Sequence, residues 1–119
     1  MSAVPTPIPD RARQLKRYAF ILRLRPGAAE AYEEAHRAVW PDMLALLKSA
    51  GVHEYSIYRR DDLLILTLRA ADFEAAWGRI ENHPVNLRWQ KAMAPLFAPQ
   101  QDLRPGERFP MMKEVFYLP

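Results

Sequence analysis

The chain has 119 residues, of which 50% are hydrophobic and 26% charged, with 17 Lys and Arg against 14 Asp and Glu and no cysteine. This composition is typical of an ordinary globular domain and excludes a fibrous or low-complexity chain. The lack of cysteine excludes a disulfide framework, a thiolate metal site and a cysteine nucleophile, and it favours the cytoplasm. No apolar run is long enough for a membrane span, so we expect no membrane partner.

The net charge of +3 by itself suggests a nucleic-acid partner, but much of it lies near the N-terminus. Residues 1–16 hold three basic side chains, one acidic side chain, three prolines and no aromatic residue. We therefore expect a flexible extension over residues 1–16 and a nearly neutral folded domain over residues 17–119. No RNA-binding motif accompanies the charge, so we expect no nucleic-acid partner.

The first half of the domain begins with an alternating apolar pattern that predicts a strand over residues 17–24, followed by a proline-glycine turn. Residues 28–40 are good helix formers and predict a helix. Pro41 breaks this helix or opens a new one, and the second helical piece is expected to end at Gly51. Two helical pieces are therefore expected to meet at Trp40 and Pro41.

The remaining elements are two strands that form a hairpin, two helices separated by a proline, and a final strand. Their expected ranges are 53–60, 63–69, 72–81, 84–97 and 112–119. The order is β-α-β-β-α-β, which predicts an α+β, ferredoxin-like domain with both helical stretches on one face of a four-stranded antiparallel sheet.

The opposite face of such a sheet is expected to be apolar and open to solvent. It is lined by strand residues that depend on the register, such as Phe20, Ile57, Tyr58, Leu64 or Leu66. A domain of this size does not easily leave such a face in water. We therefore expect a homodimer in which two sheets pack face to face.

Tyr32, His36 and Trp40 are spaced at i, i+4 and i+8, which places them along one stripe of the first helix. The commoner explanation of such a stripe is helix packing with a hydrogen-bonded histidine. The alternative is the wall of a pocket, in which the imidazole exchanges protons near neutral pH and the aromatic rings contact the apolar face of a sugar.

Two further groups are weaker candidates. Tyr55 and Tyr58 lie three apart on one strand and point to opposite faces, so at most one of them can join the pocket. Trp89 and Gln90 lie on the last helical stretch, where Trp89 is either core or pocket and Gln90 is either a solvated amide or one that binds a hydroxyl.

Other chemistries have little support in the sequence. The three histidines do not have metal-ligand spacing, so we expect no metal site. Motifs for a nucleophile elbow or a phosphate-binding loop are missing. The adjacent acidic pairs at 33–34 and 61–62 are best explained as a solvated helix face and a hairpin turn.

The combined motifs resemble the L-rhamnose mutarotase family, small cytoplasmic enzymes with a dimeric α+β barrel fold. The resemblance covers residues 16–119 and rests on four blocks: Y-x-x-x-H-x-x-x-W-P, Y-x-I-Y, the R-W pair and the tail E-V-F-Y-L-P. It implies an enzyme that interconverts the α and β anomers of a deoxy-hexopyranose without cofactor or metal. By the same resemblance, His36 is the proton donor, and Tyr32, Tyr55 and Trp89 bind the substrate.

One departure affects the expected substrate. The family pattern has two consecutive tryptophans where this chain has Trp89 and Gln90, so an amide replaces one aromatic surface at a substrate-binding position. The segment over residues 104–118 also resembles relatives that act on L-fucose, which leaves that sugar as the alternative to L-rhamnose. A haem- or quinone-type monooxygenase on a similar dimeric fold and a non-catalytic sugar- or effector-binding module are the rival classes.

Overall fold

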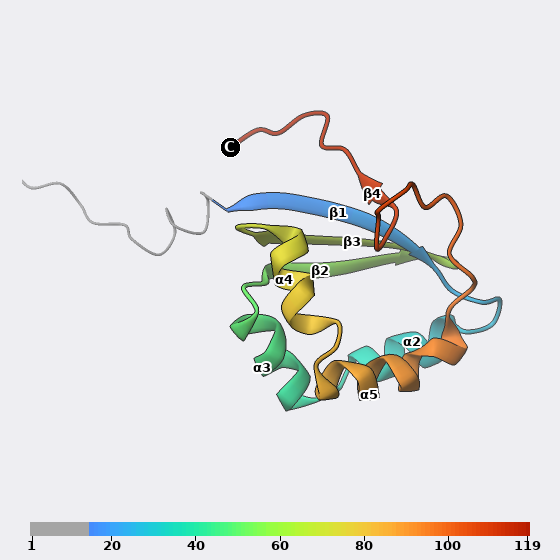
Figure 1. The fold of residues 1–119 in the computed structure, drawn as a ribbon. Helices are drawn as coiled ribbons and strands as arrows, with labels where there is room; N and C mark the ends of the chain where they lie inside the picture. The colour runs from blue at the N-terminus through green and yellow to red at the C-terminus, as the bar shows by residue number, and fades with distance from the viewer. Residues whose placement is uncertain (1–14) are drawn as a thin grey trace, which may run out of the picture.

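A computed structural model of the protein describes residues 15–119. Four strands form one sheet, and all the helices lie on one side of it (Figure 1). The elements in chain order are β1 (Lys16–Arg23), α2 (Ala29–His36), α3 (Pro41–Ser49), β2 (His53–Arg60), β3 (Leu63–Ala70), α4 (Phe73–Ile80), α5 (Pro84–Met93), the short helix η1 (Ala94–Leu96) and β4 (Met111–Met112).

The sheet has the strand order β2-β3-β1-β4, and every neighbouring pair is antiparallel. This order confirms the ferredoxin-like α+β fold that the element sequence predicts. Most of the expected extension, residues 1–14, lies outside the described residues, and Lys16 is already the first residue of β1. None of the helices in the described residues is long and apolar enough to cross a membrane.

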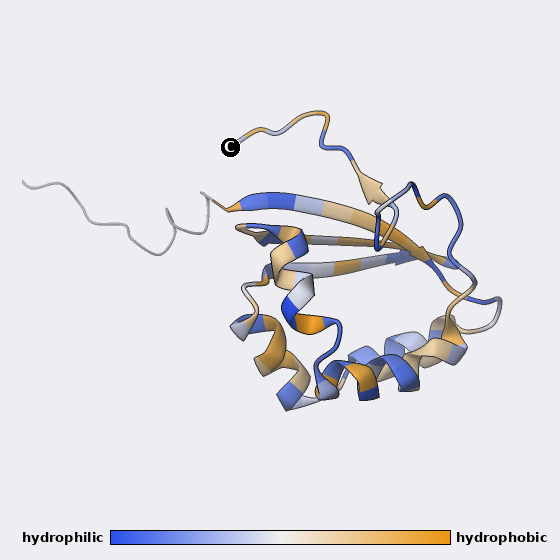
Figure 2. Ribbon diagram, in the orientation of Figure 1, coloured by the Kyte–Doolittle hydropathy of each residue, from blue (hydrophilic) through white to orange (hydrophobic). Residues whose placement is uncertain are grey.

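The core lies between the sheet and the helices. The inner face of the two central strands consists of alternate residues that are almost fully buried, among them Phe20, Leu64, Leu66 and Leu68. Hydrophobic and hydrophilic residues alternate along α5, as expected for a helix with one side on the core (Figure 2). The fold is therefore built from the alternating patterns that the sequence contains.

The register corrects the expected composition of the open sheet face. Phe20 pairs with Leu66 and Ile57 also pairs with Leu66, so these side chains share the inner face, as does Leu64. Of the residues expected on the open face, only Tyr58 lies there, and its side chain is 63% exposed. The reason is that the helices cover the face with the larger apolar side chains, which stabilises the fold most.

Two predicted elements are wrong in extent. The helix expected over residues 28–40 ends at His36, so Trp40 is the residue that precedes α3 and is not part of the first helix. The last strand is limited to Met111 and Met112, and residues 113–119 form no regular structure. A strand requires hydrogen bonds to a neighbouring strand, and beyond Met112 the tail pairs with none in the described residues.

A bulge interrupts β2 close to its start. His53 pairs with Arg69 and Ser56 with Thr67, so Glu54 and Tyr55 together face the single residue between these partners. Glu54 adopts a φ of 47°, a conformation that non-glycine residues rarely adopt. Bulges of this kind bend a strand and redirect its side chains, and they are frequent next to active sites.

Candidate active site

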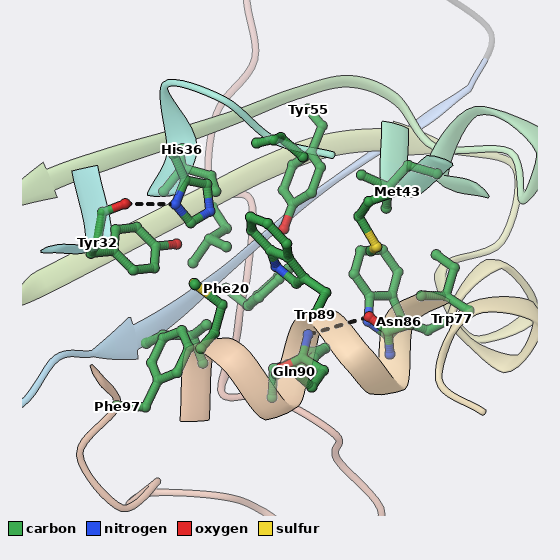
Figure 3. Close-up of a pocket in the computed structure, with 18 of the residues that line it drawn as sticks. Phe20, Tyr32, His36, Met43, Tyr55, Trp77, Asn86, Trp89, Gln90 and Phe97 are labelled. Atoms are coloured by element: carbon green, nitrogen blue, oxygen red, sulfur yellow. Dashed lines mark hydrogen bonds between the residues drawn. The ribbon is translucent and has the colours of Figure 1, made fainter. Parts of the chain in front are cut away.

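A cavity of about 700 Å³ opens between the inner face of the sheet and helices α2, α3 and α5. Its size is in the range of small-molecule sites. Five of the candidate residues that the sequence suggested line it, and Figure 3 shows several of them around a common space. They are Tyr32, His36, Tyr55, Trp89 and Gln90.

His36 lies in the last turn of α2, one turn after Tyr32. The two rings stack with their centroids 4.1 Å apart. The Nδ1 atom of His36 is 2.8 Å from the backbone carbonyl oxygen of Tyr32 (Figure 3). Because a carbonyl only accepts hydrogen bonds, Nδ1 carries a proton, and Nε2 is the ring nitrogen that remains for proton exchange.

Trp89 forms the neighbouring wall of the cavity. Its ring meets the His36 ring edge to face, with centroids 5.5 Å apart. On its other side Trp89 contacts Trp40, at a centroid distance of 5.0 Å. Trp40 does not line the cavity. Its part is therefore to hold Trp89 in place, and the three-residue stripe of the sequence reduces to Tyr32 and His36.

Tyr55 reaches the site from the sheet, at the bulge of β2. Its ring packs edge to face against Trp77, with centroids 6.2 Å apart. In Figure 3 the hydroxyl groups of Tyr32 and Tyr55 point toward the same space. Tyr58 lies on the opposite face of the sheet, which agrees with the expectation that at most one of the two strand tyrosines joins the pocket.

Burial changes the acidity of both phenols. It raises the pKa of Tyr32 to about 12. Burial also raises the pKa of Tyr55, and the nearby Tyr32 phenol raises it further. Both side chains therefore keep their protons at neutral pH, so they can donate hydrogen bonds to a ligand but cannot act as bases.

The sequence did not single out Asn86, which is the only buried polar residue among residues 15–119. It lines the cavity one helical turn before Gln90, and the Nε2 atom of Gln90 donates to its Oδ1 atom at 3.3 Å. The sequence feature that could have identified Asn86 is its spacing of three and four residues from Trp89 and Gln90, which places all three on one face of α5.

The histidines are not gathered in the fold. His83 caps the start of α5 and accepts a hydrogen bond from the Val85 backbone N–H at 3.2 Å. His53 begins β2 and is exposed. Among residues 15–119, no cluster of three or more His, Cys, Asp or Glu side chains is arranged to hold a metal ion.

Comparison with known proteins identifies the family of the chain. Residues 17–118 match the family model of L-rhamnose mutarotase. The chain belongs to the L-rhamnose mutarotase family. It is 38% identical over 106 residues to the L-rhamnose mutarotase of Rhizobium meliloti strain 1021, covering 87% of this chain and 99% of that protein. The L-rhamnose mutarotase of Escherichia coli O8 strain IAI1 is 35% identical over 105 residues, covering 87% and 98%.

Solved structures agree with this family. An L-rhamnose mutarotase from Formosa agariphila superposes with a TM-score of 0.70 at 28% identity, covering 87% of this chain and 99% of that one. Tetracenomycin F2 cyclase from Streptomyces glaucescens has a TM-score of 0.54 at 21% identity, covering 87% and 95%. The cyclase shares the fold alone. As a member of the mutarotase family, the chain is an isomerase.

The buried Tyr32 phenol makes stability depend on alkaline pH. Its pKa rises from 10 in the unfolded chain to about 12 in the fold. The contribution of the protonated phenol to the free energy of unfolding is therefore complete below pH 10 and is lost between pH 10 and 12. A pKa shift of two units corresponds to about 2–3 kcal/mol of stability. We expect urea denaturation to show less of this loss in Tyr32→Phe than in the wild type. Tyr58→Phe, which removes an exposed phenol, is the control, and an unchanged pH slope in Tyr32→Phe contradicts the prediction.

Proposed function

We propose that the protein interconverts the α and β anomers of L-rhamnopyranose. The observation that carries this proposal is His36, an imidazole whose Nδ1 is bound to a backbone carbonyl, while its Nε2 has no hydrogen-bond partner among residues 15–119 at the wall of an aromatic pocket. An imidazole that is oriented in this way can give and recover a proton near neutral pH. The relatives named L-rhamnose mutarotase support the choice of sugar.

The reaction opens the sugar ring and closes it again. Protonated His36 donates the Nε2 proton to the ring oxygen, the bond between this oxygen and C1 breaks, and the anomeric hydroxyl gives its proton to a water molecule. The aldehyde at C1 turns over. Closure reverses each transfer: the hydroxyl on C5 attacks C1, its proton returns to Nε2, and the water protonates the new anomeric oxygen.

Water is our choice for the second proton carrier because the other groups of the cavity are unsuited to the task. Among the lining residues only Glu54 carries a carboxylate, and it forms an ion pair with Arg69 at 2.9 Å. Tyr32 and Tyr55 remain protonated because burial raises the pKa of each phenol. These phenols instead suit the role of donors to sugar hydroxyls.

The remaining substrate contacts are assigned by their chemistry. Trp89 offers an apolar face beside His36, which suits the apolar side of a pyranose ring. Gln90 offers an amide that can bind a hydroxyl where the sugar presents one to it. We therefore propose Tyr32, Tyr55, Trp89 and Gln90 as substrate-binding residues and His36 as the proton donor. The proposal involves no metal or cofactor.

Proton NMR saturation transfer between the two anomeric signals tests this function. The protein is added to L-rhamnose, L-fucose and L-lyxose in separate samples at equal concentrations. We expect the fastest exchange with L-rhamnose. Faster exchange with L-fucose would make L-fucose the substrate of the same reaction and contradict the choice of L-rhamnose. Sugar binding without accelerated exchange indicates a binding module and contradicts the proposed reaction.

We also propose that the protein forms a homodimer through the open face of the sheet. Ile21 and Ile65 are direct cross-strand partners on that face. Beside it, the tail is held to β1 by an ion pair between Arg17 and Glu114 at 2.7 Å, while three apolar tail side chains are exposed by 77–90% (Val115, Phe116 and Leu118). Apolar surface of this kind favours a second copy as partner.

Light scattering tests the dimer. We expect the wild-type protein to have twice the mass of the chain and Ile65→Glu to shift it toward the monomer, because a carboxylate in the interface loses its hydration. Leu87→Glu, on the exposed side of α5, is the matched control and should remain dimeric. A monomeric wild type contradicts the proposal.

Since a fold without cysteine does not need an oxidising compartment, we place the enzyme in the cytoplasm.

A further inference from the structure

Helix α5 presents a mixed stripe to the cavity. Asn86, Trp89, Gln90 and Met93 all line it, at the spacing of one helix face. Two of these side chains are apolar and two are amides. The amides are bonded to each other, from Gln90 Nε2 to Asn86 Oδ1 at 3.3 Å (Figure 3). An otherwise apolar helix face therefore contains a polar pair, which we call the amide pair.

Asn86 is fixed by the fold, whereas Gln90 is available to a ligand. Asn86 is 6% exposed, and its Nδ2 atom donates to the Glu81 backbone carbonyl at 3.3 Å. Burying an amide is unfavourable unless it is hydrogen-bonded. Gln90 is exposed at the cavity, and within residues 15–119 its Oε1 atom has no hydrogen-bond partner. In the same range, the Nε2 atom makes one hydrogen bond, so its second N–H is available to a ligand.

A sugar hydroxyl matches this free capacity. It can donate to Gln90 Oε1 and accept from Gln90 Nε2, whereas a methyl group can do neither. A hydroxyl that bonds to this amide favours the sugar that carries it over an analogue without it. Because Gln90 is exposed, water can take the place of the hydroxyl, so the preference is modest and L-rhamnose is still accepted. The amide pair therefore favours a hydroxyl at the point where it meets the sugar.

The reaction limits which part of the sugar a fixed group can hold. During anomer exchange C1 must turn over, so a rigid contact is useful only on the part of the sugar that stays in place. The substituent on C5 belongs to that part and lies next to the ring oxygen that His36 protonates. Trp89 contacts His36 and precedes Gln90 directly in α5, which brings the amide pair to the same region of the cavity.

On this basis, and resting on the proposed mutarotase function, we propose that the amide pair binds a hydroxyl on C6. The substrate class is then extended from 6-deoxy sugars to aldohexopyranoses with a hydroxymethyl group on C5. Gln90 makes the contact, and Asn86 is a positioning residue that orients it. L-mannose is the appropriate probe because it differs from L-rhamnose only by the hydroxyl on C6.

The test compares kcat/KM for anomer exchange of L-mannose and L-rhamnose by NMR. We expect the wild type to accelerate both sugars, with values within about tenfold of each other. Gln90→Met keeps the length of the side chain but removes its hydrogen bonds. It is expected to lower the ratio of L-mannose to L-rhamnose about tenfold, which corresponds to the loss of about one hydrogen bond. The expected cause is a higher KM for L-mannose.

Two further variants separate a positioning role of Asn86 from a role in stabilising the fold. Asn86→Leu should lower the same ratio in the same direction, while L-rhamnose exchange changes by less than about threefold. Gln101→Met, the same chemical change on an exposed loop, should leave the ratio unchanged. A wild type that accelerates L-rhamnose but not L-mannose overturns the inference, as does an unchanged ratio in Gln90→Met. Failure with both sugars overturns the proposed function itself.

Discussion

Replacement of His36 is expected to lower kcat for L-rhamnose anomer exchange by about 10²- to 10⁴-fold, the usual contribution of a general acid or base. Two substitutions make the test specific. His36→Asn retains a side-chain N–H that can reach the Tyr32 carbonyl, to which Nδ1 now lies at 2.8 Å. His36→Gln instead brings an amide toward the position of Nε2. Neither amide can release a proton at neutral pH.

The controls for His36 concern folding and binding. Both variants should retain the wild-type thermal unfolding temperature within a few degrees, since the ring is only partly buried. They should also bind L-rhamnose with an affinity close to that of the wild type, because the proton acts in the transition state. If either folded variant exchanges anomers within about threefold of the wild-type rate, His36 is not the proton donor.

Phe20→Ala is expected to reduce the free energy of unfolding by about 3–5 kcal/mol, the range for removing a buried phenyl ring. Phe20 is 1% exposed. Its ring stacks on Phe109 with centroids 4.5 Å apart and also contacts Phe73 at 5.7 Å. Since domains of this size have a total stability of about 5–15 kcal/mol, the variant should lose a large share of its stability.

Urea denaturation measures this loss. Leu103→Ala, at a side chain that is 43% exposed, is the control and should change stability by less than about 0.5 kcal/mol. A double-mutant cycle of Phe20→Leu and Phe109→Leu should show a coupling of about 0.5–1.5 kcal/mol, because the two rings stack directly. A loss below about 1 kcal/mol in Phe20→Ala contradicts the role of this residue as the centre of the core.

The fold could be predicted from local sequence patterns to a large extent. Alternation predicted the strands β1, β2 and β3 but left open which alternate residues face inward, and Pro41 and Pro84 each open a helix as expected. The tail was misjudged because Val115 and its neighbours have the composition of a strand, while strand formation depends on a partner that local sequence does not reveal. Trp40 was misjudged because four residues without proline or glycine gave no signal that α2 ends at His36.

The site could be predicted only in part. Tyr32 and His36 are one helical turn apart, so their proximity follows from helix geometry alone. Tyr55 and Trp89 come from β2 and α5, and nothing local in the sequence brings these elements together; the family resemblance did. Asn86 was missed because an asparagine in the first turn of a proline-opened helix is ordinary, and only its burial distinguishes it.

The bond between His36 Nδ1 and the Tyr32 carbonyl has a consequence for how the site can change. Both residues belong to one turn of α2, so the hydrogen bond that orients the imidazole involves neither α5 nor the sheet. Trp89 is the α5 residue whose ring packs on the imidazole, so substitutions at Asn86 and Gln90 can alter the sugar that fits while this hydrogen bond is kept. Engineering of new sugar preferences should accordingly start from Asn86 and Gln90 and leave α2 as it is.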